Sequence, residues 1–246
     1  MIPRKLHYVW LGGKAMPPAM ARLLDGWRAL MPTFEVLEWN ERNVDMAAHP
    51  WRERMYREGQ YAFASDHVRL AVLRDHGGIY LDTDMELKKS LEPFLDERCF
   101  MGFEYDTFLS TAILGSEPGH PLFHALLDLY DGRDAPVVSN ALVTDHFIRQ
   151  YPELRLNNRD QHVGEGIRIL PKEYFILPGW DRHGNYARHH ANNHWKGEQR
   201  NGLRPGSLVR RVLGDVLYYK LVNQRMRWND TYRARQRELN RQRMKA

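Results

Sequence analysis

The sequence of 246 residues has a single cysteine and no long uninterrupted hydrophobic run. With Cys99 as the lone thiol, no disulfide can form within the chain, which fits a reducing compartment. A bilayer-spanning helix needs about 20 consecutive apolar residues, and the sequence contains no such segment. Its first residues also lack the charged-then-apolar pattern of a secretory signal. The composition therefore predicts a cytoplasmic protein, with peripheral contact at the inner face of a membrane left open.

Charge is unevenly distributed along the chain. Residues 204–246 hold twelve Lys and Arg residues against three acidic ones, a net charge of +9, so that residues 1–203 carry −4 of the total of +5. A mildly acidic body argues against a nucleic-acid-binding core and assigns any anionic partner to the basic end. The glycine-rich, polar stretch 197–206 is the best boundary. We expect a domain at 1–203 and a basic, amphipathic helical tail at 204–246.

The periodicity of apolar residues predicts an α/β domain. Residues 5–10 and 34–39 have the character of short strands, and the apolar positions between them recur at helical spacing. Strand, helix and strand in this order form a βαβ opening. Further helices are expected at 61–75, 121–130 and 140–150, and further strands at 79–81, 98–103, 109–115 and 167–170.

Two carboxylates follow the short apolar strand 79–81. Asp82 and Asp84, spaced by two on an extended segment, can address one hard cation such as Mg²⁺ or Mn²⁺. A cation there would offset the charge of a diphosphate and stabilise it as it leaves. Taken alone, an Asp-x-Asp pair more often marks an acidic turn, because short motifs match by chance. The neighbouring residues therefore decide whether the pair is a metal site or an acidic turn.

The preceding helix carries a matching polar face. Ser65, Asp66 and Arg69 are three or four positions apart and so share one side of the helix. Gly77-Gly78 ends this helix just before the Asp-x-Asp strand. An Asp–Arg pair on its own is more often a solvated helix pair. Next to this strand, it predicts the second wall of a pocket.

A histidine-rich stretch lies near residue 190. His190 and His194 have the i, i+4 spacing of helical zinc sites, but the glutamate that must follow the first histidine of such a site is missing. A polar loop with solvated histidines is the plain alternative.

The motifs together resemble a known family. Tyr61–Leu91 resembles the DXD-containing sugar transferases of glycosyltransferase family 32, which includes Golgi α-1,6-mannosyltransferases and bacterial capsule and lipopolysaccharide enzymes. The large-toxin glucosyltransferase domains are more distantly similar. Ile2–Gly13 is similar to the usual N-terminus of the family, and residues 186–195 to its late His-x-x-x-x-Ser-Trp element. There His189 matches the histidine, while His194 stands where serine is usual. The resemblance covers most of residues 1–195.

The resemblance implies an α/β fold of the GT-A, Rossmann-like type, a UDP- or GDP-sugar donor and a divalent metal, Mn²⁺ or Mg²⁺. It implies that Asp84 and Asp82 bind the metal, with His189 or His194 as a third ligand that stays open. Trp10 by itself would be a core residue, whereas the family implies that it stacks on the nucleobase. The donor-binding residues implied are Val9, Trp10, Tyr61, Ser65, Asp66, Arg69, Tyr80 and Asp82, and the catalytic ones Asp82, Asp84 and Arg69.

The predicted function is a metal-dependent, retaining glycosyltransferase. It would move a hexose or N-acetylhexosamine to a glycan or lipid-linked acceptor in surface polysaccharide biosynthesis. Residues 104–115 and Asn140-Ala141 are expected on the acceptor side, where Asp106, Asp145 and His146 are candidate polar groups. The alternatives are a Mg²⁺-dependent phosphohydrolase and a non-catalytic nucleotide-sugar-binding module. The tail is either an interfacial helix at an anionic bilayer or a packed helix with a solvated end.

Overall fold

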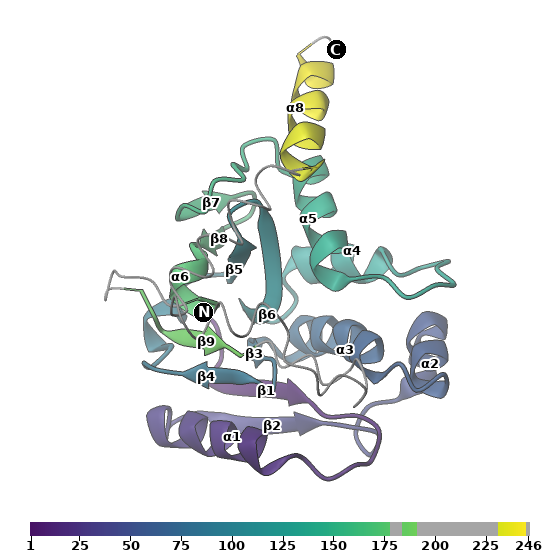
Figure 1. The fold of residues 1–246 in the computed structure, drawn as a ribbon, viewed down its shortest axis with the longest axis vertical. Helices are drawn as coiled ribbons and strands as arrows, with labels where there is room; N and C mark the ends of the chain where they lie inside the picture. The colour runs from purple at the N-terminus through teal and green to yellow at the C-terminus, as the bar shows by residue number, and fades with distance from the viewer. Residues whose placement is uncertain (178–183, 191–230, 245–246) are drawn as a thin grey trace, which may run out of the picture.

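The computed structural model describes residues 1–177, 184–190 and 231–244. A central seven-stranded sheet with the order β2-β1-β3-β6-β5-β8-β7 lies between helices on its two faces (Figure 1). This mixed α/β architecture confirms the predicted fold class. The strands are β1 (Lys5–Val9), β2 (Glu35–Trp39), β3 (Gly78–Leu81), β5 (Cys99–Tyr105), β6 (Phe108–Ser116), β7 (Gln161–Val163) and β8 (Ile167–Leu170).

Strand direction determines where the polar motifs meet. β1 runs parallel to both β2 and β3, so the carboxyl ends of these three strands lie at one edge of the sheet. β6 is antiparallel to β3 and to β5, while β8 is parallel to β5 and antiparallel to β7. Ligands of open α/β sheets bind at the carboxyl ends of parallel strands. Residues 10–13 and 82–84 leave the sheet at that edge.

The helices cover the sheet with their apolar faces. On α1, Met20, Leu24 and Trp27 are buried, as the helical spacing of those residues predicts. The helices predicted around 61–75, 121–130 and 140–150 are confirmed, with ends shifted by a few residues. The helices are α1 (Pro18–Leu30), α2 (Pro50–Arg57), α3 (Tyr61–His76), α4 (Pro121–Asp128), α5 (Ser139–Gln150), α6 (Lys172–Phe175) and α8 (Thr231–Arg243), with 3-10 turns η1 (Met46–Ala48) and η2 (Glu92–Phe94).

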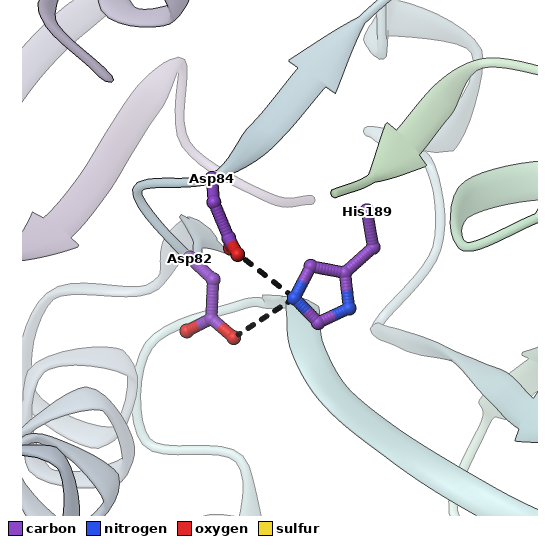
Figure 2. A group of neighbouring side chains, drawn as sticks. All are labelled: Asp82, Asp84 and His189. Carbon is purple, nitrogen blue, oxygen red and sulfur yellow. Dashed lines mark ion pairs between the residues drawn. The ribbon is translucent and has the colours of Figure 1, made fainter. Parts of the chain in front are cut away.

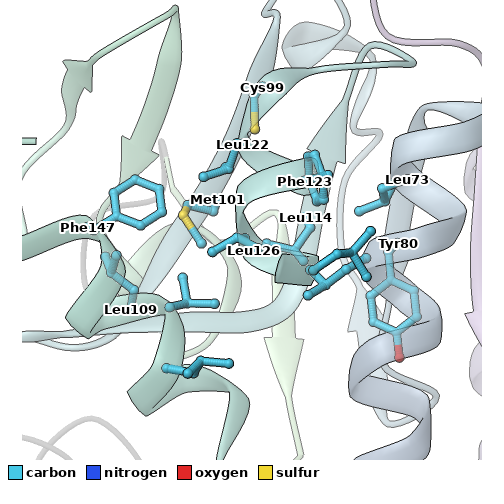
Figure 3. Close-up of a cluster of buried hydrophobic side chains, with 14 of the residues drawn as sticks. Leu73, Tyr80, Cys99, Met101, Leu109, Leu114, Leu122, Phe123, Leu126 and Phe147 are labelled. Carbon is cyan, nitrogen blue, oxygen red and sulfur yellow. The ribbon is translucent and has the colours of Figure 1, made fainter. Parts of the chain in front are cut away.

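Two hydrophobic clusters fill the two faces of the sheet. Side chains of a strand alternate between faces, so Tyr80 packs in one cluster while Ile79 and Leu81 pack in the other. Figure 3 shows Tyr80 beside Leu73 of α3, in the cluster that α4 and α5 also cover. Tyr80 therefore faces the helix that carries Arg69.

A second, two-stranded sheet lies beside the first. β4 (Met85–Leu87) pairs antiparallel with β9 (Ala187–His189), with Met85 opposite His189. Trp27 of α1 donates its indole N–H to the carbonyl of Met85 at 2.8 Å, which fixes β4 against the helix. Neither strand was predicted from the sequence. Their pairing brings the histidine-rich stretch to the Asp-x-Asp turn.

The C-terminal helix α8 packs against α5, and both lie at one end of the molecule (Figure 1). Gln236 donates to the carbonyl of Leu154 at 2.8 Å, and the ring of Tyr232 lies 5.1 Å from that of Phe108. Residues 204–230 of the predicted tail lie outside the described residues. Within the described ranges, no helix is long and apolar enough to cross a membrane.

Candidate active site

The Asp-x-Asp motif forms the turn between β3 and β4. The backbone N–H of Asp82 donates to the carbonyl of Ala112 at 2.9 Å, which extends the ladder with β6 by one more bond. The N–H of Met85 then donates to the carbonyl of Asp82 at 2.9 Å and closes the turn. Because both ends of the turn are held by backbone hydrogen bonds, the two carboxylates are fixed side by side at the edge of the sheet.

His189 completes a three-residue group with these carboxylates. Its Nε2 lies 3.2 Å from Oδ1 of Asp84 and 4.0 Å from Oδ2 of Asp82 (Figure 2). One potential ligand atom from each residue lies within 4.8 Å of the others. The backbone N–H of His190 also donates to the carbonyl of Asp84 at 3.1 Å, which ties β9 to the turn. His194, the other predicted ligand, lies outside the described residues.

The chemistry of this group fits a divalent cation. Two carboxylates supply oxygen ligands and one imidazole supplies a nitrogen ligand, and first-row metal ions bind such mixed sets. Burial lowers the pKa of His189, but its hydrogen bond to Asp84 and the charges of Glu104, Asp84 and Asp82 outweigh that effect and raise the pKa to about 9. The carboxylates therefore stabilise a positive charge at the place where they could hold a metal ion.

The two oxygens of Asp82 face different partners. Oδ1 accepts a hydrogen bond from the hydroxyl of Tyr80 at 2.8 Å and pairs with Nη1 of Arg69 at 3.1 Å. Oδ2 faces His189. Because Oδ1 is anchored by Tyr80 and Arg69, Oδ2 is the oxygen left on the side of His189.

Arg69 is the buried centre of the polar network beneath the turn. Its Nη2 pairs with Asp66 at 2.7 Å, its Nη1 donates to the carbonyl of Thr111 at 2.8 Å, and its guanidinium lies 4.6 Å over the ring of Tyr80. Burial lowers the pKa of Arg69, and the charges of Asp82, Tyr80 and Asp66 raise it above its ordinary value. The side chain thus supports the carboxylates, and its predicted contact with phosphate stays a prediction.

The predicted polar face of α3 is present, but its hydrogen bonds and ion pairs are made within the protein. Asp66 and Arg69 form the expected i, i+3 pair, and burial raises the pKa of Asp66 to about 7, with Arg69 opposing and Asp82 reinforcing the shift. Ser65 donates its hydroxyl to the carbonyl of Ala62 at 2.7 Å, within its own helix. Contacts of Ser65 and Asp66 with a donor remain predictions.

The residues predicted for the nucleobase lie where β1 ends and α3 begins. Val9 is buried, and the half-buried Trp10 donates its indole N–H to the carbonyl of Lys14 at 2.7 Å. Tyr61 is 37% exposed and covers Gly12, where a β-carbon would lie 2.5 Å from the tyrosine ring. Val9 and Trp10 thus lie at the same sheet edge as the Asp-x-Asp turn, with Tyr61 beside Gly12, and their contacts with a nucleobase stay predictions.

The candidates for the acceptor side make contacts within the protein. Asp106 is buried in an ion pair with Lys172 at 2.6 Å, and Asp145 is paired with Arg235 of α8 at 2.6 Å. His146 is 8% exposed, and its burial lowers its pKa. The roles of all three toward an acceptor stay predictions.

Two other residues on β5 and β6 do reach the site. Thr111 donates its backbone N–H and its hydroxyl to Oδ1 of Asn140 at 2.9 and 2.7 Å, while its carbonyl binds Arg69. Glu104 lies 3.9 Å from Nδ1 of His189. Sequence analysis placed Thr111 and Glu104 only within the range 104–115, because no local motif marks a residue at an irregular position of a β-strand.

Comparison with known proteins agrees with this site. The family described as "glycosyltransferase sugar-binding region containing DXD motif" matches residues 17–101. An uncharacterized glycosyltransferase of Acanthamoeba polyphaga mimivirus is 28% identical over 174 residues, which cover 64% of this chain and 68% of the viral protein. Inositol phosphoceramide mannosyltransferase 3 of Schizosaccharomyces pombe is 27% identical over 49% of this chain and 35% of its own length.

A yeast relative and two solved structures extend the comparison. The mannosyl phosphorylinositol ceramide synthase CSH1 of Saccharomyces cerevisiae is 30% identical over 38% of this chain and 26% of the yeast protein. The chain thus spans only about a third or less of the fungal relatives. The PaToxG glycosyltransferase superposes with a TM-score of 0.48 at 19% identity over 59% of this chain and 70% of its own. The galactosyltransferase LgtC does so with 0.46 at 11% identity over 77% and 87%.

The match over residues 17–101 and the curated relatives support a DXD-type glycosyltransferase. They bear out the predicted resemblance to the DXD-containing sugar transferases, while the sheet itself confirms the α/β class of the fold. The matched region ends before β9, so it contains Asp82 and Asp84 but not His189.

Proposed function

We propose that this chain is a metal-dependent glycosyltransferase that moves a hexose or N-acetylhexosamine from a UDP- or GDP-sugar, with retention of anomeric configuration. The observation that carries the proposal is the Asp82–Asp84–His189 group at the end of β3. It combines a metal donor set with the motif that gives the matching family its description. The region 1–203 would form the catalytic domain and 204–246 its tail.

We propose Mn²⁺ rather than Mg²⁺ as the bound ion. Mg²⁺ prefers oxygen ligands at strict octahedral geometry, whereas an imidazole in the set suits a first-row transition metal. Asp84 and His189 would bind the ion, and Asp82 would reach it through Oδ2. When bound, such an ion neutralises the charge that develops on the departing diphosphate.

The other residues of the site position this centre. Tyr80 and Arg69 hold Oδ1 of Asp82, and Thr111 joins Arg69 to Asn140. Preorganised groups of this kind need no rearrangement during the reaction, which is how an enzyme stabilises developing charge. Val9, Trp10, Tyr61, Ser65 and Asp66 would contact the donor. The departing diphosphate would accept the proton of the acceptor hydroxyl, so no protein nucleophile is assigned.

The acceptor is proposed as a glycan or lipid-linked molecule. The fungal relatives are named for the mannosylation of inositol phosphoceramide, which supports a lipid-linked acceptor and makes mannose the first sugar to test. A role in surface polysaccharide biosynthesis is an extension of this proposal. It predicts transfer to a polyprenol-linked glycan rather than to a ceramide.

Residues 204–246 are proposed to bring the enzyme to an anionic membrane surface. α8 exposes Arg237 and Arg241 to solvent, and each basic residue near such a surface contributes about 1 kcal/mol. Co-sedimentation with phosphatidylserine vesicles should fall when 204–246 is deleted. Unchanged co-sedimentation would make the tail a structural element only. This placement is compatible with the predicted cytoplasmic location at the inner face of a membrane.

The first experiment is thermal unfolding with a panel of UDP- and GDP-sugars that includes GDP-mannose, with and without Mn²⁺. A ligand that binds only the folded state raises stability by about 2.7 kcal/mol at a concentration of 100 times Kd. We expect a Mn²⁺-dependent shift with one base, and its loss in Asp84→Asn. Glu86→Gln changes a carboxylate on the next strand and should retain the shift.

Product analysis separates the alternatives. Transfer to an acceptor supports the proposal, and proton NMR of the new glycosidic bond tests retention. Steady release of phosphate from simple esters would instead support a phosphohydrolase. Binding without turnover, unaffected by Asp84→Asn, would support a binding module.

A further inference from the structure

Glu104 approaches His189 from the side opposite the Asp pair. Its Oε1 lies 3.9 Å from Nδ1 of His189, while Nε2 of the same ring faces Asp84 at 3.2 Å. Figure 2 shows Nδ1 on the side of the ring turned away from both aspartates. Both side chains are largely buried, with about 15% of His189 and 14% of Glu104 exposed. One histidine therefore lies between two acidic groups.

Glu104 lies at a β-bulge of β5. Phe103 pairs with Leu109 and Tyr105 pairs with Phe108, so two steps along β5 match one step along β6 and Glu104 is the extra residue. Such bulges are common beside active sites.

Ser110 holds the carboxylate of Glu104 in place. Its hydroxyl donates to Oε2 of Glu104 at 2.6 Å and lies 3.3 Å from the N–H of Ala112. The carbonyl of Ala112 accepts the backbone N–H of Asp82. Since Oε2 is engaged by Ser110, Oε1 is left toward His189. The same strand therefore supports both the Asp-x-Asp turn and Glu104.

Metal ligation by Nε2 would place the ring proton on Nδ1. Within the part of the chain that the structure describes, this buried Nδ1 has no hydrogen-bond partner. A buried N–H without a partner is costly, and metal-ligating histidines nearly always donate their second N–H to a carboxylate, carbonyl or water. Glu104 is the carboxylate nearest to fulfilling that role, and a shift of about 1 Å would bring Oε1 into hydrogen-bond range.

We propose that Glu104 is a positioning residue that accepts the Nδ1 proton of His189 and so orients the ring toward the metal. This inference rests on the proposed metal centre. The carboxylate does not touch the ion, and its contribution is to the tautomer and direction of the ring. Ser110 acts one step further out, by orienting Glu104.

The test is the affinity of the full-length chain for Mn²⁺ alone, measured from the electron paramagnetic resonance signal of the free ion. Removal of such a partner typically lowers metal affinity 10–100-fold, and that is the loss expected for Glu104→Ala. Glu104→Gln keeps an oxygen that can accept a hydrogen bond from Nδ1–H, so it should retain most of the wild-type affinity for Mn²⁺. Ser110→Ala should have an intermediate effect.

Glu86→Gln is the matched control. Glu86 accepts from Nε2 of His190 at 3.1 Å on the same small sheet but does not face His189, so its loss should leave Mn²⁺ affinity unchanged. Mn²⁺ affinity equal to wild type in folded Glu104→Ala, with binding abolished in Asp84→Asn, would overturn the role of Glu104 alone. Absence of Mn²⁺ binding in the wild-type chain would overturn the metal centre and this role together.

Discussion

Nε2 of His189 lies 3.2 Å from Oδ1 of Asp84, although the two residues belong to distant parts of the chain. The antiparallel pairing of β9 with β4, with His189 opposite Met85, produces this contact. Two consecutive backbone features, the β3–β4 turn and the β4–β9 ladder, therefore build one three-residue group.

Replacement of His189 should show how much its imidazole contributes to the affinity for Mn²⁺. His189→Gln removes the imidazole donor, so Mn²⁺ affinity should fall by at least about 100-fold, beyond what loss of an outer-shell partner causes. The measurement is isothermal titration with Mn²⁺. The neighbouring His190→Gln serves as control, because His190 faces Glu86. Equal affinity in the two variants would contradict the assigned third ligand.

Arg69 should be intolerant even of lysine. Its two Nη atoms engage Asp66 and Asp82 at once, a forked geometry that a single ammonium cannot reproduce. Disruption of a buried pair typically costs about 3–5 kcal/mol, so Arg69→Lys should lower the free energy of unfolding by an amount of that order.

Urea denaturation measures this loss. Arg98→Lys, at an exposed pair with Glu117, should cost about 0–1 kcal/mol and is the control. In a double-mutant cycle, Asp66→Asn should cost less in the Arg69→Lys background than in wild type. Additive losses would show that the two side chains do not interact energetically.

Gly12 and Gly13 form a natural pair of test sites. Both have positive φ, +95° and +65°, so alanine strains the backbone at either position. Only at Gly12 does a new β-carbon meet another group, 2.5 Å from the ring of Tyr61, while Gly13 has nothing within 4 Å. Gly12→Ala should therefore lose about 1–3 kcal/mol more than Gly13→Ala, as expected for overpacking.

Calorimetry of both variants measures that difference. Tyr61→Ala combined with Gly12→Ala should remove most of the excess loss, because the clash disappears. Tyr61→Ala should also weaken donor binding, because Tyr61 is proposed to contact the donor. An equal loss at the two glycines would contradict the contact between Gly12 and Tyr61.

His7 should make the protein sensitive to acid. It donates from Nε2 to the carbonyl of Gly77 at 2.8 Å and accepts the indole N–H of Trp39 at Nδ1 at 3.0 Å, which defines a neutral ring. Burial lowers its pKa from 6.5 to about 4, against the opposing effect of the bond to Gly77. Below pH 6.5 the unfolded chain binds a proton that the folded chain does not.

The sign of the effect follows from these two values. Stability is fully retained above pH 6.5 and is lost as pH falls toward 4, by up to about 3 kcal/mol for this group at 1.36 kcal/mol per pKa unit. His7→Gln should flatten the pH dependence of the urea midpoint in this window. His162→Gln, at an exposed ring, should not. Identical slopes in wild type and His7→Gln would contradict the prediction.

Much of the fold could be predicted from the sequence because its signals are local. The βαβ opening, the helix before Gly77-Gly78 and the apolar strand that presents Asp82 each depend on periodicity and turn residues within a short window. The pairing of Asp66 with Arg69 is local as well, since three positions on a helix place them on one face. His189 entered only through the resemblance to a family.

Other features required the folded chain. The short strands β4 and β9 carry no periodic signal of their own and form because each pairs with the other. The ion pairs of Asp106 and Asp145 have the same origin, since their partners Lys172 and Arg235 lie far along the sequence. No local pattern marks which acidic residue finds a cation in the folded state.

The sequence alone thus determined the α/β class, the position of the Asp-x-Asp motif at a strand end and the polar face of α3, because each depends on neighbours within a few residues. The tertiary structure decided that His189 joins the two aspartates, that Arg69 turns inward to hold Asp82, and that Glu104 lies beside His189. These contacts join residues that are distant along the chain. Only strand register and burial, which are properties of the whole fold, bring such residues together.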